Sequence, residues 1–346
     1  MAKSTQRDLN LVDIARRSGV SRSTVSRVVN DDPYVSDSTR AKVLAVINEV
    51  GYVPNTAARM LRRQRSQIIA LVIPDPFTNV LSTDNPYYYT TVIQNINEVT
   101  QQRDYAMLLW VGGVDESKER FYERILKNRI MDGILVASSV EEEGHFVREL
   151  MSLKLPFVII GRPLLHTEEI NFVTVDNVSA AEKAVKHLLV RGRRRIATIT
   201  GDWDNVDSRE RLEGYQRALT GAGIPYDETL VIRGRFNQQC GYEAMQELLA
   251  ARPDIDGLFA ASDIIAYGAI TAIQESGRQV PADIAVVGFD DLPSAAAFDP
   301  PLTTIRHPIK DKSREAATLL LNVIESGDDM TRAVLLPTDL VVRKST

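Results

Sequence analysis

A short stretch near the N-terminus combines residue types that bind nucleic acid. Residues 19–30 read GVSRSTVSRVVN, with two arginines and four serine or threonine hydroxyls around a thin apolar skeleton. Arginine donates two parallel hydrogen bonds to the O6/N7 edge of guanine, and hydroxyl groups bind phosphate oxygens. A solvated helix face of the same composition is the ordinary alternative, so the surrounding elements have to decide between the two.

The charge distribution favours the nucleic-acid interpretation. Residues 1–66 carry 12 Lys and Arg against 6 Asp and Glu, a net charge of +6, whereas residues 67–346 carry a net charge of −11. Charge asymmetry along a chain marks a nucleic-acid-binding part. The protein is therefore expected to have a basic head on an acidic body.

Helix-start and helix-stop residues predict three short helices in the head. Asn10 is expected to cap the first helix, which Gly19 ends by taking a left-handed turn. Ser21 starts the second helix, and Ser36 starts a third that ends at Gly51. A small shared core is expected from Ile14, Ala15, Val20, Val25, Val28, Val43 and Ile47.

Two helices joined by a glycine turn form the helix-turn-helix pattern, whose second helix enters the major groove of DNA. Arg22 and Ser23 at its N-terminal end can meet base edges, and Arg27 lies on a compatible face. The candidate phosphate contacts are Asn10, Ser21, Ser26, Asn30 and Asn55.

Residues 54–66 are predicted to form a helix only under certain conditions. Pro54 disfavours helix at Val53, and the segment TAARMLRR that follows Asn55 is made of good helix formers. About eight residues are fewer than the roughly 12–15 at which isolated helices become marginal in water. We expect this hinge to order against DNA and a second copy of the chain. Leu61 could then wedge between base steps of the minor groove, beside Ala58 and Arg62; for Leu61 alone, a small packing contact is the simpler alternative.

From Ile68 onward, short apolar runs alternate with helical segments, which predicts parallel sheets covered by helices. Nine strands are expected, in the segments IIALVIPD, YAMLLWV, GILVAS, PFVIIG, FVTVDN, RIATITG, TLVIRG, GLFAASD and IAVVGFDD. In open sheets of this type, ligands bind outside the carboxyl ends of the strands.

Several classes of protein and site are not expected from the sequence. A single cysteine and four dispersed histidines give no disulfide framework and no metal-ligand spacing, so neither a metal nor a cofactor is predicted. The apolar runs are too short to cross a membrane, and the N-terminus lacks a signal-peptide core, which predicts a cytoplasmic protein. Phosphate-loop and nucleophile-elbow motifs are not found, so we expect no enzymatic activity.

The segment LVDIARRSGVSRSTVSRVVNDDPYVSDSTRAKVLAVINEVGYVPNTAARML closely resembles the DNA-binding head and hinge of the lactose-repressor/galactose-repressor family of bacterial transcription regulators. The strings VSRSTVSRVVN and GYVPN are its most specific parts, and the resemblance continues through nearly the whole chain. It implies an all-α helix-turn-helix head and hinge, followed by an α/β effector domain with two lobes, like a periplasmic binding protein.

The expected domains are residues 1–53 for the helix-turn-helix head, 54–66 for the hinge and linker, and 67–346 for effector binding and dimerisation. Within the last domain, the first lobe is expected near 67–163 and 298–328, and the second near 164–297 and 329–346. The resemblance also implies effector contacts. Asp290 and Arg211 are the strongest candidates, followed by Phe236 and the aromatic pair Tyr87 and Tyr88. The remaining candidates are Arg162, Trp203, Ser262 and Asp263.

Two positions depart from the family pattern, since Ser262 and Ala137 stand where relatives carry an asparagine. They leave the identity of any sugar open. The expected function is a homodimeric repressor that binds a roughly palindromic DNA operator under the control of a carbohydrate-like effector, either an inducer or a co-repressor. A sugar-binding transport protein would share the two-lobe body, but the basic head and the missing signal peptide argue against it.

Overall fold

The computed structural model describes residues 9–30, 32–52, 65–73, 86–111, 130–137, 143–163, 166–327 and 330–346. The chain folds as two compact units, Met1–Ser66 and Gln67–Thr346. The candidate hinge residues Asn55, Ala58, Leu61 and Arg62 lie outside the described residues.

The head contains the three helices that the sequence predicts, and each begins at the predicted residue. They are α1 (Leu11–Ser18), α2 (Arg22–Val29) and α3 (Asp37–Val50). The Asn10 side chain accepts hydrogen bonds from the backbone N–H groups of Val12 and Asp13 at 2.9 and 3.3 Å, which satisfies two donors that a helix start leaves free. Gly19 and Gly51 end α1 and α3 with φ angles of 66° and 62°, a left-handed conformation that glycine adopts without steric penalty.

One apolar cluster holds the three helices together. Ile14, Val25 and Val43 are completely buried in it, one from each helix. The other four predicted core side chains belong to the same cluster, which confirms the predicted core: Ala15, Val20, Val28 and Ile47. The same packing leaves the opposite face of α2 available to solvent.

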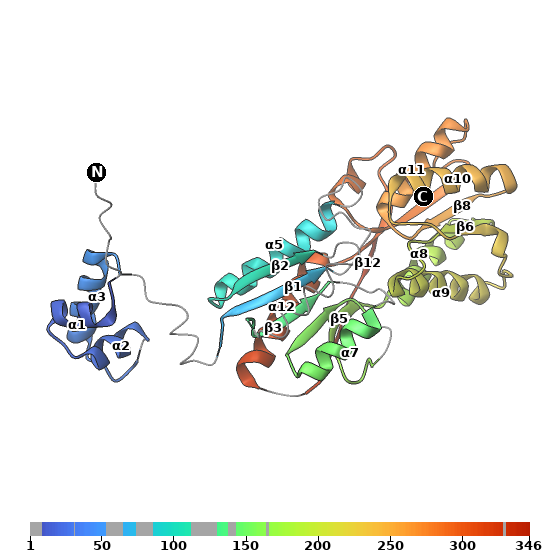
Figure 1. Cartoon of the computed structure of the whole chain (residues 1–346). Coiled ribbons are helices and arrows are strands. Elements are labelled where there is room, and N and C mark those ends of the chain that lie inside the picture. The colour runs from blue at the N-terminus through green and yellow to red at the C-terminus, as the bar shows by residue number, and fades with distance from the viewer. Residues whose placement is uncertain are drawn as a thin grey trace, which may run out of the picture. The chain divides into compact units, whose positions relative to one another are not determined.

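The first lobe of the second unit is built on a six-stranded parallel sheet (Figure 1). In spatial order its strands are β11 (Ala333–Leu336), β5 (Asn171–Val175), β4 (Phe157–Ile160), β3 (Gly133–Val136), β1 (Ile68–Ile73) and β2 (Ala106–Val111). Alternate residues of β1 point to opposite faces. Ile69 and Leu71 pack with α5 (Pro86–Gln102) and α12 (Ile309–Ser326), whereas Ala70 and Val72 pack with α7 (Glu143–Leu153). Helices on both faces explain why β1 reads as a continuous apolar run.

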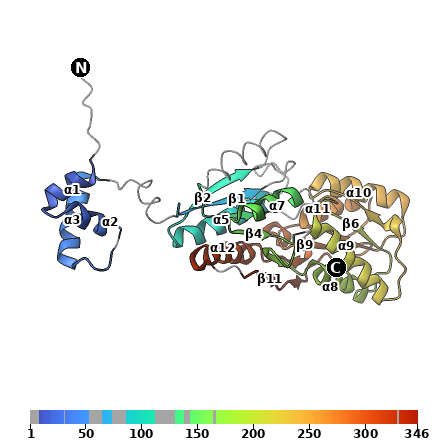
Figure 2. The ribbon, with the colours of Figure 1, turned by 60° about the horizontal axis from the view of Figure 1, so that its bottom comes forward.

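The second lobe repeats this architecture on another six-stranded sheet (Figures 1 and 2). Its strands, in spatial order, are β12 (Asp339–Val341), β10 (Thr303–Arg306), β9 (Ala285–Asp290), β8 (Gly257–Ala260), β6 (Ile196–Ile199) and β7 (Val231–Ile232), with β12 antiparallel to β10. Leu258 packs with α10 (Gln238–Ala251) and α11 (Asp263–Glu275). Phe259, the next residue, packs on the opposite face with α8 (Asn177–Val190) and α9 (Val206–Gly221). Two 3-10 turns, η2 (Glu228–Leu230) and η3 (Pro293–Ala296), complete the lobe.

The chain crosses between the two sheets three times, between β5 and α8, between β10 and α12, and between β11 and β12. These crossings correct the lobe boundaries expected from the sequence. Strands β5 and β11 pair within the first sheet rather than the second, and β10 pairs with β9 in the second sheet rather than lying in the first lobe. The sheet to which a strand belongs is decided by its backbone hydrogen bonds with neighbouring strands. These strands lie far apart in the sequence, so the pairing cannot be read from the connecting segments.

No helix within the described ranges is long and apolar enough to cross a membrane.

Candidate functional site

The face of α2 that points away from the head core carries the predicted base-reading residues. Arg22, Ser23 and Arg27 are all exposed. Ser21 sits at the N-cap, where its hydroxyl accepts the backbone N–H of Thr24 at 3.1 Å. The cap fixes the start of α2 and therefore the direction in which the exposed side chains that follow it project.

Four predicted phosphate contacts, those among the described residues, also have internal partners. The Asn10 side chain caps α1, and the Ser21 hydroxyl lies 2.7 Å from that of Ser23. The Asn30 amide donates to the backbone carbonyl of Ser26, one turn earlier in α2. In the described chain these polar groups hold the helix ends in place.

The second candidate site lies where the two lobes meet. Tyr88 of α5 and Lys312 of α12 come from the first lobe, and Arg211 of α9 and Asp290 at the end of β9 come from the second. His307 lies on the crossing from β10 to α12. These five residues are called the inter-lobe cluster below.

Arg211 is held rigidly inside the cluster. It is 4% exposed, and its Nε donates to the Asn177 side-chain oxygen at 3.0 Å. Its Nη1 donates to the backbone carbonyl of Ala261 at 2.6 Å, and its guanidinium carbon lies 3.6 Å from the centroid of the Phe289 ring. Stacking on an aromatic face and two fixed hydrogen bonds orient the cation, so its remaining N–H groups project in a set direction.

Asn177 connects Arg211 to a second layer of charged groups. Its amide nitrogen donates to Asp207 and to Glu210, both at 3.0 Å. Arg162 pairs with Glu210, with 2.6 Å between its Nε and the carboxylate oxygen. Arg162, a predicted effector contact, thus reaches the inter-lobe cluster through Glu210 and Asn177.

Asp290 ends β9 in an unusual backbone conformation. Its φ is 122° and that of Asp291 is 55°, values that residues other than glycine rarely adopt. Burial raises the pKa of the Asp290 carboxyl to about 7, although the positive charges of Arg211 and Lys312 oppose the shift. Backbone strain and a perturbed carboxyl pKa are properties that concentrate at functional sites.

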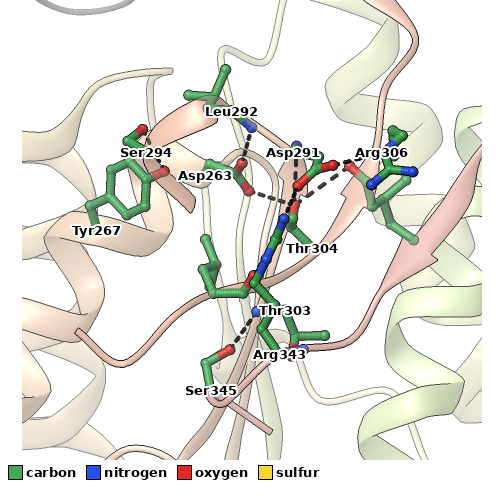
Figure 3. A network of polar contacts seen from close by, with 12 residues as sticks. Asp263, Tyr267, Asp291, Leu292, Ser294, Thr303, Thr304, Arg306, Arg343 and Ser345 are labelled. Atoms are coloured by element: carbon green, nitrogen blue, oxygen red, sulfur yellow. Dashed lines mark hydrogen bonds and ion pairs between the residues drawn. The ribbon is translucent and has the colours of Figure 1, made fainter. Parts of the chain in front are cut away.

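A buried acid holds this turn in place (Figure 3). Asp263 is completely buried and accepts hydrogen bonds from the backbone N–H of Leu292 at 2.8 Å and the Thr304 hydroxyl at 2.5 Å. On the other side of the turn, Asp291 pairs with Arg306 at 2.8 Å and Arg343 at 2.6 Å. Burial and the Asp290 charge raise the pKa of Asp263 well above its ordinary value. The neighbouring Ser262 caps α11 by accepting the backbone N–H of Ile265 at 3.2 Å, so Ser262 and Asp263 support the site from behind.

The predicted aromatic contacts are distributed around the cluster. Tyr88 belongs to it, and Tyr87 packs against the first-lobe core. Phe236 lies beside Arg211, with 5.9 Å between the guanidinium carbon and the ring centroid. Gly201 leaves room for this ring position, because a Cβ there would come within 2.1 Å of the Phe236 ring and would displace it. Trp203 is 38% exposed and stacks under Arg233, whose guanidinium carbon lies 3.9 Å from the indole centroid.

Sequence reasoning missed two members of the cluster, His307 and Lys312. The imidazole Nδ1 of His307 lies 3.4 Å from an Asp290 carboxylate oxygen, and burial lowers its pKa well below the ordinary value. The Lys312 ammonium donates to the Tyr88 hydroxyl at 3.2 Å, and burial lowers its pKa to about 8. A signal for Lys312 was present in the sequence. It stands three residues after Ile309 and four before Ala316, within the apolar stripe by which α12 packs on the sheet.

Within the part of the chain that the structure describes, no group of three or more His, Cys, Asp and Glu side chains is arranged to hold a metal ion.

Comparison with known proteins identifies both parts of the chain. Residues 10–55 match the family described as bacterial regulatory proteins, lacI family, and residues 185–346 match the periplasmic binding protein-like domain. The HTH-type transcriptional regulator CelR of Thermobifida fusca is 37% identical over 96% of each chain.

Among solved structures, a complex of the transcriptional regulator CelR with cellobiose is 35% identical, with a TM-score of 0.76 over 98% of this chain and 100% of that one. A lac repressor dimer bound to operator and the anti-inducer ONPF is 26% identical, with a TM-score of 0.84 over 98% and 99%. A capped helix with exposed arginines, a two-lobe body and relatives matched from end to end lead to one conclusion. The chain belongs to the lacI family of bacterial regulatory proteins and is a DNA-binding transcriptional regulator.

Proposed function

We propose that the protein is a homodimeric repressor whose affinity for a roughly palindromic operator is set by a carbohydrate-like effector bound at the inter-lobe cluster. The observation that carries the proposal is the composition of this cluster. A buried arginine and a buried carboxylate, Arg211 and Asp290, come from one lobe, and their charges influence the pKa of Tyr88 from the other. The same chain carries a helix-turn-helix head.

On the DNA side, we assign base readout to Arg22, Ser23 and Arg27 on the exposed face of α2. Arginine at these positions suits the guanine edge in the major groove, and the capped N-terminus of α2 suits a phosphate. The proposed phosphate contacts are Asn10, Ser21, Ser26, Asn30 and Asn55, and the proposed minor-groove contacts of the hinge are Ala58, Leu61 and Arg62. Two heads would read half-sites about one helical turn apart.

On the effector side, Asp290 accepts hydrogen bonds from ligand hydroxyls, and Arg211 donates to ring or hydroxyl oxygens. Tyr88 and Phe236 offer aromatic surface to the apolar face of a sugar ring. Solved relatives support this ligand class, since one is a complex with cellobiose and another, from Enterococcus faecium, holds ribose. We place Ser262 and Asp263 in supporting positions; Tyr87, Arg162 and Trp203 complete the proposed site.

The signal passes from ligand to DNA through the relation between the lobes. An effector that touches both lobes favours the arrangement in which both sets of contacts form, so it shifts the population toward that state. Operator affinity then changes if this arrangement also alters the spacing of the two heads or the order of the hinges. The direction of the change decides whether the ligand acts as inducer or co-repressor.

Two alternatives are less well supported. A sugar-transport protein would have no use for the basic head with its exposed arginines, and an enzyme would need reactive groups beyond those of a binding site. We therefore propose a binding function without catalysis, exercised in the cytoplasm, where the operator DNA lies.

The experiment combines operator selection with a ligand screen. The purified full-length protein selects its operator from random duplexes, and ligands that raise its melting temperature are then tested for an effect on operator binding. Asp290→Ala is expected to abolish the response to a ligand while operator affinity without ligand stays unchanged. Asp339→Ala, which removes an exposed carboxylate on β12, serves as the control. Ligand-dependent release that persists in Asp290→Ala would show that the cluster is not the effector site.

A further inference from the structure

The buried lysine of the inter-lobe cluster is incompletely partnered. Lys312 is 1% exposed, and its ammonium has one hydrogen bond, 3.2 Å long, to the Tyr88 hydroxyl. The Tyr88 ring centroid lies 5.4 Å from its Nζ. No ion pair to Lys312 is formed by any residue in the described ranges. An ammonium has three N–H donors, so two remain for a ligand.

Arg211 and His307 are also incompletely partnered among the described residues. Both hydrogen bonds of Arg211 go to neutral oxygens, those of Asn177 and Ala261, and none of the residues described here forms an ion pair with it. His307 is 5% exposed, and its Nε2 has no hydrogen-bond partner among the residues that the structure places. Buried polar atoms are normally hydrogen-bonded, so an orphaned ring nitrogen beside two unpaired cations points to a missing ligand group.

The charges around Lys312 show what kind of group is missing. Burial and the nearby Arg211 lower its pKa, whereas the charges of Asp207 and Asp290 raise it, although neither carboxylate forms an ion pair with Lys312 within the described residues. Asp207 is engaged by Asn177, and Asp290 by His307. A hydroxyl would satisfy the free N–H groups of Lys312 but would leave its ammonium without an ion-pair partner in contact, and buried charges are normally paired.

We propose that the effector carries an anionic group, a carboxylate or a phosphate, that forms an ion pair with Lys312 and accepts a hydrogen bond from the Nε2–H of neutral His307, while its hydroxyls bind Asp290 and Arg211. The effector is then an acidic carbohydrate. Lys312 becomes the residue that sets specificity, because it distinguishes the acid from the neutral parent sugar by charge. This inference rests on the proposed function, since it assigns a chemical class to the same ligand.

The test uses matched pairs of ligands on the full-length protein. Glucose and galactose are titrated by calorimetry next to their uronates and their 6-phosphates, so that the carboxylate and phosphate sources are separated. In the wild-type protein, at least one acid is expected to bind about tenfold or more tightly than its parent sugar, as a charge-assisted hydrogen bond adds about 1.4 kcal/mol or more.

The variant Lys312→Met identifies the residue responsible. It replaces a buried ammonium by an apolar side chain of similar length, so it should fold with an unchanged or higher melting temperature. Its preference for the acid should fall about tenfold or more, to near parity with the parent sugar. Lys310→Met removes an exposed lysine two residues earlier in α12 and should keep the full preference. His307→Gln, which retains a hydrogen-bond donor but no ring, should weaken binding of the acid more than binding of the parent sugar.

The outcomes separate this inference from the proposed function. A neutral sugar that binds at least as tightly as its acids and changes operator affinity would overturn the inference and leave the proposed function intact. An undiminished preference for the acid in Lys312→Met would also overturn it. If no sugar or acid bound and none changed operator affinity, the proposed function would fail together with the inference.

Discussion

The carboxyl group of Asp290 lies at a position where burial disfavours its charged form. Burial raises its pKa to about 7, and the turn that presents it has two consecutive residues with positive φ. Asp263 holds this turn from behind through Leu292 and Thr304. Backbone strain and the desolvation of a carboxylate lower the free energy of unfolding unless a ligand binds the carboxylate. This destabilisation is expected to be measurable in the ligand-free protein.

The pH dependence of stability tests this cost. The folded chain retains a proton on Asp290 between its ordinary pKa of 3.8 and about pH 7, where the unfolded chain has released it. The stabilising contribution of this proton is complete below pH 3.8 and is lost as the pH rises to about 7. Asp290→Asn lacks this loss, so its free energy of unfolding relative to wild type should increase by up to about 1.4 kcal/mol per pH unit in this interval.

Urea unfolding of both proteins at pH 5 and at pH 8 measures the difference, with the exposed Asp339→Asn as control. A difference between Asp290→Asn and wild type that is the same at both pH values would show that Asp290 ionises normally in the folded chain.

Single site residues could be predicted from the sequence only where they follow a strand or match a family motif. Asp290 ends a strand that reads as buried, and Arg211 was identified by resemblance; the structure brings both to one place. Lys312 and His307 come from a helix and a crossing segment that meet the second lobe only after folding. The apolar stripe of α12 indicates that Lys312 is buried, but the partners of both residues lie far away in the sequence, so spacing does not predict these contacts.

At the scale of elements, α2 shows how local sequence sets up a surface. Ser21 caps its N-terminus, and Val25 and Val28 are buried in the head core. With one face fixed by packing, the opposite face has to project Arg22 and Arg27 into solvent. The only ion pair that the structure gives Arg27 within the described head is a contact of 3.9 Å with Asp32, so its guanidinium is available for DNA.

Replacing Arg27 tests this face of α2. Arg27→Ala should lose about 1–3 kcal/mol of discrimination at one base pair of each half-site, since a bidentate guanine contact is removed. Binding to operators with every substitution at each position measures the loss by fluorescence anisotropy. Arg17→Ala removes the same charge from an exposed position on α1 and should weaken all operators equally. An unchanged base preference in Arg27→Ala would exclude this residue from readout.

The strands show which elements hydrophobic patterning can predict and which it cannot. All nine predicted strands are present, and most are apolar runs buried in a parallel sheet, whereas the edge strands β2 and β7 are only partly buried. Strands β10 and β11 were missed for physical reasons. The first reads TTIR and buries two threonines, and the second alternates between exposed and half-buried side chains. Because these strands flank two of the crossings, the predicted lobe boundaries were wrong there.

At the scale of the whole molecule, charge divides the chain into two functional parts. The basic head carries a net charge of +6, so binding should release counterions from DNA, by about 0.9 per phosphate neutralised. The logarithm of operator affinity should therefore fall steeply and linearly with the logarithm of salt concentration. Asp290→Ala should show the same slope, because its change lies outside the head. Operator binding that is independent of salt would contradict phosphate contacts by the head.

In the proposed function, effector binding at the inter-lobe cluster and operator binding by the head are coupled through one conformational equilibrium. The most direct measurement is a reciprocal titration, with operator affinity determined with and without saturating effector and effector affinity determined with and without operator. Thermodynamic linkage predicts that both affinities change by the same factor, within the range of roughly 5- to 150-fold that is typical of allosteric coupling. An effector that binds with the same affinity to the free protein and to its operator complex would show that the two sites are not coupled.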